Sequence, residues 1–345
     1  MNSKCPSLLR RSADLPARAT MVLTSRCPIM RRTQPRWECI EVPDETGQSC
    51  VDAHQHFWDL TRNRHPWLQD SPPAAFRYGD CSALRRNYLP DDYRADALGQ
   101  GVHATVYVEA EWDPGDPLGE TRWVHELSAQ AGVPNAMVAQ AWLDRDDVAA
   151  VLAAQAGFAL VRGVRHKPRA AASPQAMLHG APGSMGDPRW RAGYALLKEH
   201  GLHFELQAPW WHLEEAAELA SAHPRTRLVL NHTGLPADRS AAGLAGWRRG
   251  MRALADCPNA MVKISGLGLP GRPWRVEDNA PIVRETLALF GAGRCMFASN
   301  FPVDGLVARF ATIWEGFRAI VADLPPDTRA RLFGETAREV YRIAP

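Results

Sequence analysis

Two histidines near position 55 are the residues of this chain best suited to chemistry. His54 and His56 follow a short apolar run that begins near Cys50. Because alternate side chains of a β-strand point to the same face, Asp52, His54 and His56 are expected to share one side. Two adjacent imidazoles can share a divalent metal or hold one polarised oxygen, since each offers a nitrogen donor or acceptor. The spacing therefore predicts a catalytic or metal-binding pair at the end of a strand.

Seven further β-rich runs follow, and stretches of helical length rich in Ala, Leu and Arg separate most of them. These runs are 104–112, 136–143, 159–166, 202–207, 227–232, 260–267 and 295–304. Strands that alternate with helices predict βαβ units and a parallel sheet. Eight units over about 290 residues fit one (β/α)8 barrel. An open doubly wound sheet is disfavoured because no GxGxxG turn follows the first run. The predicted fold class is α/β, a (β/α)8 TIM barrel.

Polar residues end seven of these runs, and the C-terminal ends of the strands carry the chemistry in such a barrel. They are His54 and His56; Glu109 and Glu111; Arg162, Arg165 and His166; Glu205 and Gln207; Asn231 and His232; Lys263 and Ser265; and Asn300 and Asp304. Any one of them has an ordinary explanation, and we expect Lys263 to form an internal salt bridge. Polar groups are costly to bury unless they are paired or used. Their recurrence at seven ends predicts a pocket.

Six motifs, taken in this order, resemble the amidohydrolase superfamily. They are Asp-Ala-His-Gln-His-Phe-Trp-Asp (52–59), Tyr-Val-Glu-Ala (107–110), Arg-Gly-Val-Arg (162–165), Leu-Asn-His-Thr-Gly (230–234), Lys-Ile-Ser-Gly-Leu (263–267) and Phe-Ala-Ser-Asn-Phe-Pro-Val-Asp (297–304). The chain is most similar to the amidohydrolase-related branch, which contains sugar-acid lactonases (L-fuconolactonases and L-rhamnonolactonases) and 2-pyrone-4,6-dicarboxylate lactonases. The resemblance runs from about Cys50 to the C-terminus. It implies a metal-dependent-hydrolase-like barrel that hydrolyses a lactone or related cyclic ester.

The resemblance also implies a set of metal ligands, and this chain departs from it. Metal-dependent relatives hold zinc with the HxH pair, a carboxylated lysine or acid on the fourth strand, histidines on the fifth and sixth, and an aspartate on the eighth. Here the fifth strand offers Gln207 and the eighth offers Asn300, and a neutral amide is a poor zinc ligand. We expect no metal cofactor. One zinc held by His54, His56 and His232 remains the alternative.

Lactone hydrolysis needs an activated water, a stabilised oxyanion and a proton for the leaving oxygen. The resemblance assigns catalysis to His54, His56, His232 and the region of Asn300 and Asp304. Asn300 can orient water or donate to an oxyanion, but it cannot take a proton. Asp304 either replaces the base or caps a helix that begins near Gly305.

A second group of residues is predicted to bind substrate. It comprises Glu109, Arg162, Arg165, His166, Gln207, Trp58 and Trp112. A guanidinium binds a carboxylate in a planar fork, so the substrate is expected to carry an acid group. The alternative is that one arginine pairs internally with Glu109 or Glu205. Aromatic faces next to strand ends can cover a sugar ring or a planar pyrone.

Composition is that of a cytoplasmic enzyme with reduced thiols. The seven cysteines include no CxxC, and no apolar stretch approaches the roughly 20 residues that span a bilayer. Residues 1–48 carry eight Lys/Arg against five Asp/Glu and lack periodicity, so we expect a disordered or non-native extension. Residues 49–345 are predicted to form a single barrel domain with a formal charge of −1 (+2 less the +3 of the extension). That charge disfavours nucleic acid as a partner. The expected partner is a small-molecule substrate, and a homo-oligomer is compatible with these features.

Three functional classes follow from these observations. The first is a lactone or related ester hydrolase. The second is a metal-dependent decarboxylase or hydratase of an aromatic acid, which normally keeps the aspartate that Asn300 replaces. The third is a protein that retains the pocket without catalysis.

Overall fold

The computed structural model describes residues 50–71 and 76–344. Within them, eight parallel strands follow one another around a barrel in chain order. The strands are β1 (Cys50–Gln55), β2 (Val102–Val108), β3 (Ala136–Gln140), β4 (Val161–Arg165), β5 (His203–Leu206), β6 (Leu228–Leu230), β7 (Ala260–Ile264) and β8 (Cys295–Phe297). The expectation for residues 1–48 lies outside the described residues. The predicted TIM barrel is confirmed.

The barrel closes between β1 and the segment that follows β8. The amide of His56 donates to the carbonyl of Phe301 at 2.8 Å, and the amide of Asn300 donates to the carbonyl of His54 at 2.8 Å. These bonds place the first and last strand ends side by side. Residues 245 and 246 positions apart in the sequence therefore meet at one rim of the barrel.

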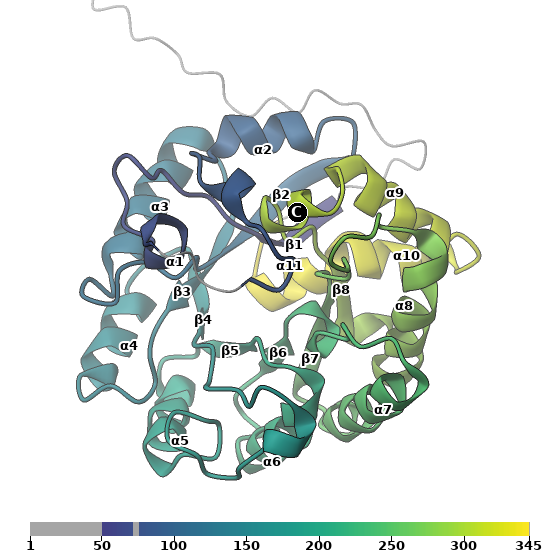
Figure 1. Ribbon diagram of the computed structural model, residues 1–345. Helices are drawn as coiled ribbons and strands as arrows, with labels where there is room; N and C mark the ends of the chain where they lie inside the picture. The colour runs from purple at the N-terminus through teal and green to yellow at the C-terminus, as the bar shows by residue number, and fades with distance from the viewer. Residues whose placement is uncertain (1–49, 72–75, 345) are drawn as a thin grey trace, which may run out of the picture. The chain divides into compact units, whose positions relative to one another are not determined.

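Helices surround the strands, as Figure 1 shows in a view close to the barrel axis. They are α1 (Pro66–Gln69), α2 (Pro90–Asp96), α3 (Gly119–Ala131), α4 (Val148–Ala156), α5 (Pro188–Ala195), α6 (Leu213–Ala222), α7 (Ala241–Ala255), α8 (Val276–Phe290), α9 (Phe310–Ile320), α10 (Pro326–Ala330) and α11 (Thr336–Tyr341). Most pack an apolar face on the strands, and Trp190, Trp247 and Trp314 are fully buried there. No helix among the described residues is long and apolar enough to cross a membrane.

Helix α11 packs against one end of the barrel interior. Val340 and Tyr341 form an apolar cluster with Val51, Ala104 and Ala136, which lie early in their strands. The Tyr341 hydroxyl donates to Glu205 on β5 at 2.5 Å. This end of the barrel is therefore filled by side chains, and the opposite rim remains for a pocket.

A β-bulge in β1 separates Asp52 from the two histidines. Asp52 pairs with Thr105 and Gln55 with Tyr107, so β1 has one residue more than β2 in this interval. The Asp52 carboxylate accepts hydrogen bonds from the Tyr93 hydroxyl at 2.7 Å and from the Ser299 hydroxyl at 2.5 Å. The expectation that Asp52 shares a face with His54 and His56 is therefore wrong, because the extra residue breaks the alternation.

Candidate active site

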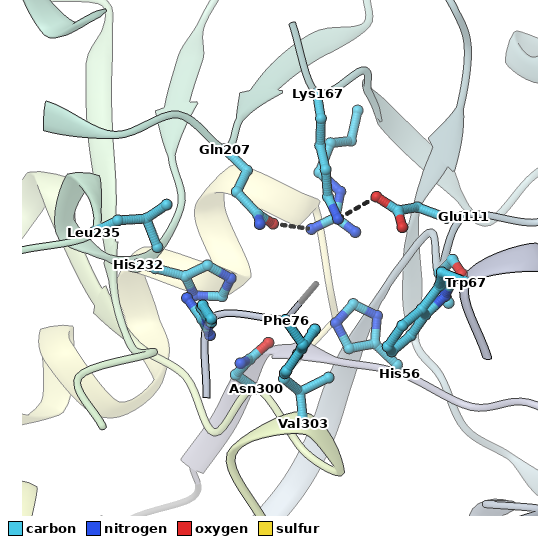
Figure 2. A pocket seen from close by; sticks show the side chains of 13 residues that line it. His56, Trp67, Phe76, Glu111, Lys167, Gln207, His232, Leu235, Asn300 and Val303 are labelled. Carbon is cyan, nitrogen blue, oxygen red and sulfur yellow. Dashed lines mark hydrogen bonds and ion pairs between the residues drawn. The ribbon is translucent and has the colours of Figure 1, made fainter. Parts of the chain in front are cut away.

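A cavity of about 300 Å³ lies at the C-terminal ends of the strands. It is lined by His56, Trp67, Phe76, Arg77, Ala110, Glu111, Arg165, Lys167, Gln207, His232, Leu235, Asn300 and Val303. In Figure 2, Gln207 and Lys167 face this space from one side, and Asn300 and Val303 face it from the opposite side. Six strand ends and the loop that follows β1 thus contribute to one pocket, which we call the central pocket.

Three imidazoles meet at the base of the central pocket. The Nε2 atoms of His54 and His56 are 3.2 Å apart, and the rings of His54 and His232 are 4.7 Å apart between centroids. His54 is fully buried and does not line the pocket itself. His56 and His232 line the pocket, and Figure 2 shows them on opposite sides of it. The structure therefore brings together the three histidines that the sequence selects.

The protonation of His56 is set by its contact with the strand beside it. Its Nδ1 lies 2.7 Å from the carbonyl oxygen of Val108, so Nδ1 carries the proton and Nε2 has the free lone pair. Burial, and next the positive charge of Arg165, holds the pKa of His56 well below its usual range. The ring is therefore neutral at neutral pH. Its Nε2 lone pair is free when His54 carries its own proton on Nδ1, an atom that is buried without a hydrogen bond to protein.

His232 is held by a serine and by a close backbone approach. Its Nδ1 lies 2.9 Å from the hydroxyl of Ser265. A Cβ atom on Gly266 would come within 2.8 Å of the His232 ring, so glycine is needed at that position. Burial, followed by the charges of Arg77 and Arg165, lowers the pKa of His232 well below its usual range. This imidazole is neutral as well.

Asn300 and Asp304 act as a pair. The side-chain amide of Asn300 donates from Nδ2 to Oδ1 of Asp304 at 2.6 Å. That carboxylate also accepts from the Tyr78 hydroxyl at 2.9 Å and from the Gly266 amide at 3.1 Å, and it lies 3.4 Å from the Arg77 guanidinium. Burial raises its pKa, although Arg77 and these hydrogen bonds act in the opposite direction. Asp304 is buried behind Asn300 and does not line the central pocket.

The helix-capping alternative for Asp304 is wrong. Asp304 lies inside the short helical turn Val303–Leu306, and its carboxylate accepts no amide of that turn. The Asp304 carboxylate instead connects the loops after β1, β7 and β8.

Asn300 has a left-handed backbone with φ 55°, as do His232 (φ 55°) and Glu111 (φ 56°). Such residues are uncommon and concentrate at functional sites.

Arg165 is paired within the protein. Its Nε donates to Glu109 at 2.5 Å, another nitrogen donates to the Glu109 carbonyl, and Nη1 donates to Gln207 at 3.2 Å. The side chain is only 2 % exposed. The alternative of an internal pair with Glu109 is therefore what the structure contains. Little of this guanidinium remains for a substrate carboxylate.

Arg162 does not reach the central pocket. It is the second residue of β4, and its Nε donates to the carbonyl of Tyr341 at 2.7 Å on the far side of the barrel. The prediction that Arg162 binds substrate is not supported. The apolar run in the sequence begins at residue 159, but β4 begins at Val161, so Arg162 lies at the start of the strand and not at its C-terminal end. Trp58 does not line the central pocket either. It is fully buried, and its indole donates to the carbonyl of Arg86 at 2.7 Å.

Residues 51–343 match the amidohydrolase family. The chain belongs to this family. It is 37% identical over 294 residues to the uncharacterized protein y4mH of Sinorhizobium fredii, covering 85% of this chain and 98% of that protein. It is 30% identical over 301 residues to an L-fucono-1,5-lactonase of Burkholderia ambifaria, covering 85% of this chain and 95% of the relative.

A solved structure has a similar fold. The crystal structure of an amidohydrolase from Burkholderia multivorans with bound zinc is 26% identical and has a TM-score of 0.70. The match covers 86% of this chain and 99% of that one. The resemblance to amidohydrolases and to L-fuconolactonases in particular is therefore confirmed. This amidohydrolase is a hydrolase.

The relative from Burkholderia multivorans binds zinc. In this chain, His54, His56 and His232 are the candidate donors. Within residues 50–71 and 76–344, however, no group of three or more His, Cys, Asp or Glu side chains is spaced to hold a metal ion. Gln207 accepts from Arg165, and Asn300 is bound to Asp304. The donor set does not fit a dedicated zinc centre.

Several residues of this amidohydrolase site are not predicted from the sequence. Three of them are Phe76, Arg77 and Tyr78. They belong to the loop after β1 and lie far along the sequence from any strand end, although the fold brings them to the site. The Arg77 side chain is 24% exposed, and its Nη1 is buried without a hydrogen bond. The run Phe-Arg-Tyr in a polar loop was the available signal, since large aromatic residues in loops need something to pack on.

The remaining polar residues form the floor and a second cavity. Lys263 forms the expected internal salt bridge with Glu205, at 2.7 Å. Burial lowers the pKa of Lys263 to about 8. Burial also acts to raise the pKa of Glu205, but the charge of Lys263 and the neighbouring groups hold it far below its usual range. Glu109, Trp112 and His166 line a separate cavity beside the central pocket.

Proposed function

We propose that this amidohydrolase opens the ring of a lactone, or of a related cyclic ester, of a sugar acid or dicarboxylic acid by attack of water on the carbonyl. The observation that carries the proposal is the contact of His56 Nδ1 with the Val108 carbonyl, which leaves a neutral Nε2 lone pair in the pocket. The similarity to an L-fucono-1,5-lactonase supports the choice of a lactone.

His56 is assigned as the general base. Nε2 takes a proton from water as the water oxygen bonds to the lactone carbonyl carbon. The electron pair of the carbonyl moves to its oxygen. When the intermediate collapses, the bond between the carbonyl carbon and the ring oxygen breaks. The ring oxygen then takes the proton from His56, and the product is a hydroxy acid.

His232 is assigned to the carbonyl oxygen. If the hydroxyl of Ser265 donates to Nδ1, the proton of the neutral ring is on Nε2 and can be donated into the pocket. A donor directed at the developing oxyanion stabilises the transition state more than the ground state. Ser265 is then a positioning residue that selects the tautomer of His232.

Asn300 is assigned to the attacking water. Asp304 holds the Nδ2 side of the amide, so the Oδ1 side is left to accept a hydrogen bond from water. The Asn300 side chain can also accept from the protonated His56 ring, which acts to raise the pKa of His56, although burial outweighs it. Asp304 acts through Asn300 and is a positioning residue in this mechanism, not the base.

Arg77 is assigned to a carboxylate, either a second acid group of the substrate or the one that ring opening releases. A guanidinium with one nitrogen buried and unpaired at the pocket wall favours an anionic partner. Lys167, which pairs with Glu111 at the pocket edge, is the second cation within reach of the same space. These two residues replace Arg162 and Arg165 as the expected acid-binding groups.

Turnover of a lactone panel, followed by proton release with a pH indicator, tests the proposal. The panel contains sugar-acid lactones with and without a carboxylate and pyrone dicarboxylates. Hydrolysis of at least one class, lost in His56→Ala, is the expected result. Binding without turnover of any lactone would contradict the proposal and favour a protein that keeps the pocket without catalysis. A metal-dependent decarboxylase is less well supported because the zinc ligand set is incomplete.

A further inference from the structure

A second cavity of about 380 Å³ adjoins the central pocket on the side of β2, β3 and β4. The two cavities share Trp67, Glu111, Arg165 and Lys167 in their walls. The second cavity adds Trp112, Trp142 and His166. We call it the side cavity. Because its walls are continuous with those of the central pocket, a molecule held in one can extend into the other.

The ring of His166 is fixed at the base of the side cavity. Its Nδ1 accepts a hydrogen bond from the Leu143 amide at 3.1 Å and another from the Trp190 indole at 2.9 Å. A nitrogen that accepts from two N–H donors carries no proton, so the proton of the neutral ring is on Nε2. Burial lowers the pKa of His166, which keeps the ring neutral. His166 is therefore a donor with a fixed direction.

The indole of Trp142 stacks on the His166 ring and presents a flat aromatic face. The indole is parallel to the His166 ring within 7°, with 6.0 Å between centroids. Trp142 is nonetheless 37% exposed, whereas Trp190, which donates to His166, is fully buried. Leaving a large aromatic face in water forgoes burial energy of roughly 25 cal/mol per Å². An ordered aromatic face beside a cavity suits a ligand that covers it.

The wall towards the central pocket is charged. Lys167 and Glu111 form an ion pair there, and their side chains remain 35% and 40% exposed. The pair offers a cationic donor and an anionic acceptor within one short span. Together with the N–H of His166, it provides both kinds of partner that hydroxyl groups require. An apolar face flanked by donors and acceptors matches a pyranose, which has C–H faces and a hydroxyl-bearing edge.

We propose that the side cavity is a subsite for a second pyranose ring, so that the substrate is an aldonolactone carrying a glycosyl substituent. This proposal rests on the proposed lactonase function of the central pocket. The central pocket, at about 300 Å³, is at the lower limit of small-molecule sites and suits a single ring. The glycosyl ring stacks on Trp142, and its hydroxyls contact His166 and the Glu111–Lys167 pair.

Kinetics on matched substrates test the subsite. Each aldonolactone of a panel is assayed with and without a glycosyl substituent, and a phenyl-substituted lactone is included. In the wild type, the glycosylated lactones should have the higher kcat/KM. Trp142→Ala should lower that advantage by about 10-fold and leave the single-ring lactones within about twofold. Trp142→Phe keeps an aromatic face and should retain much of the advantage.

Leu98→Ala is the control, because Leu98 is an exposed apolar residue (70% exposed) outside both cavities. Equal losses on both substrate types in Trp142→Ala, or no loss, would overturn the subsite. A preference for the phenyl-substituted lactone would overturn the pyranose. If no lactone is hydrolysed, the proposed function fails separately. Calorimetric titration with disaccharide aldonic acids then decides the subsite: binding weakened by Trp142→Ala supports it, and absence of binding to the wild type overturns it.

Discussion

The carboxylate of Asp304 accepts a hydrogen bond from the side-chain amide of Asn300 at 2.6 Å and is buried behind that amide. The acidic group of this pair is therefore displaced from the pocket wall by the length of one side chain. An amide takes its place at the wall. In the proposed mechanism an imidazole accepts the proton instead, so the Asn300–Asp304 pair is a sensitive test of that mechanism.

Substitution of the three histidines should reduce catalysis without unfolding the protein. Each of His54→Ala, His56→Ala and His232→Ala should lower kcat/KM by about 100-fold or more, which corresponds to roughly 2.7 kcal/mol of transition-state stabilisation. Circular dichroism should show the wild-type fold, because His56 and His232 line the pocket and His54 packs against their rings. Near-wild-type activity in all three variants would contradict the assignment.

The pH dependence follows from the same residues. A base must be unprotonated, and the pKa of His56 is held well below its ordinary value of 6.5. We expect kcat/KM to stay constant as pH falls through 6.5 and to decline only at lower pH. A decline centred at 6.5 or above would show that the base is a more exposed group.

Asp304→Asn should impair the orientation of Asn300 more than it impairs binding. The new amide can present an N–H group to Nδ2 of Asn300, so the Asn300 amide can reverse its direction. We expect kcat to fall by about tenfold with little change in KM, and the acidic limb of the pH–rate profile to persist. If the limb disappears with the carboxylate, Asp304 is the base and the assignment to His56 is wrong.

Asn300→Asp should create a better metal ligand. A carboxylate beside His56 and the other imidazoles supplies the oxygen donor that zinc favours over an amide. Dialysis against zinc followed by elemental analysis should show more bound metal in Asn300→Asp than in the wild type. Wild-type activity should be unaffected by a chelator. Loss of wild-type activity on chelation, restored by zinc, would contradict the metal-free mechanism.

Arg77→Met should weaken the binding of acidic substrates selectively. Methionine keeps much of the apolar length but lacks the charge, so KM for carboxylate-bearing lactones should rise by about tenfold while neutral lactones change little. Arg162→Met is the matched control, since Arg162 bonds to Tyr341 away from the pocket. A larger effect of Arg162→Met on KM would overturn the placement of the acid-binding site.

Glu120→Gln should flatten the pH dependence of stability. Glu120, on α3, accepts from the Tyr107 hydroxyl at 2.7 Å and from the Ala110 amide at 2.6 Å. Burial raises its pKa to about 8 from an ordinary 4.5. The folded state thus binds this proton more tightly than the unfolded state, and its stabilising contribution is lost as pH rises from 4.5 to about 8.

Urea unfolding at pH 5 and pH 8 measures this effect. The free energy of unfolding should fall with pH in the wild type, and the fall should be smaller in Glu120→Gln. Glutamine resembles the protonated acid in shape, so the two proteins should be similar in stability at pH 5. Equal slopes in both proteins would show that Glu120 is not responsible.

The sequence predicts the barrel well because strand ends in such a fold share one rim. His54, His56 and His232 end different runs, and the topology alone brings them together. Arg162 is misplaced because the boundary of a strand is set by its pairing with neighbours, which the apolar pattern does not reveal. Asp52 leaves the histidine face because of a bulge that depends on the register with β2. Arg77 comes from a loop, where no periodic signal exists.

The left-handed backbone of Asn300 restricts which residues can occupy this position over evolutionary time. Asparagine, aspartate and glycine tolerate a φ of 55°, whereas β-branched residues do not. Codons for asparagine and aspartate differ by a single base. A carboxylate and an amide can therefore interchange at this strand end in one mutational step without rebuilding the loop. Descendants of one barrel can gain or lose an acidic wall residue, and with it a hard-metal ligand, while Asp304 and the surrounding loops stay in place.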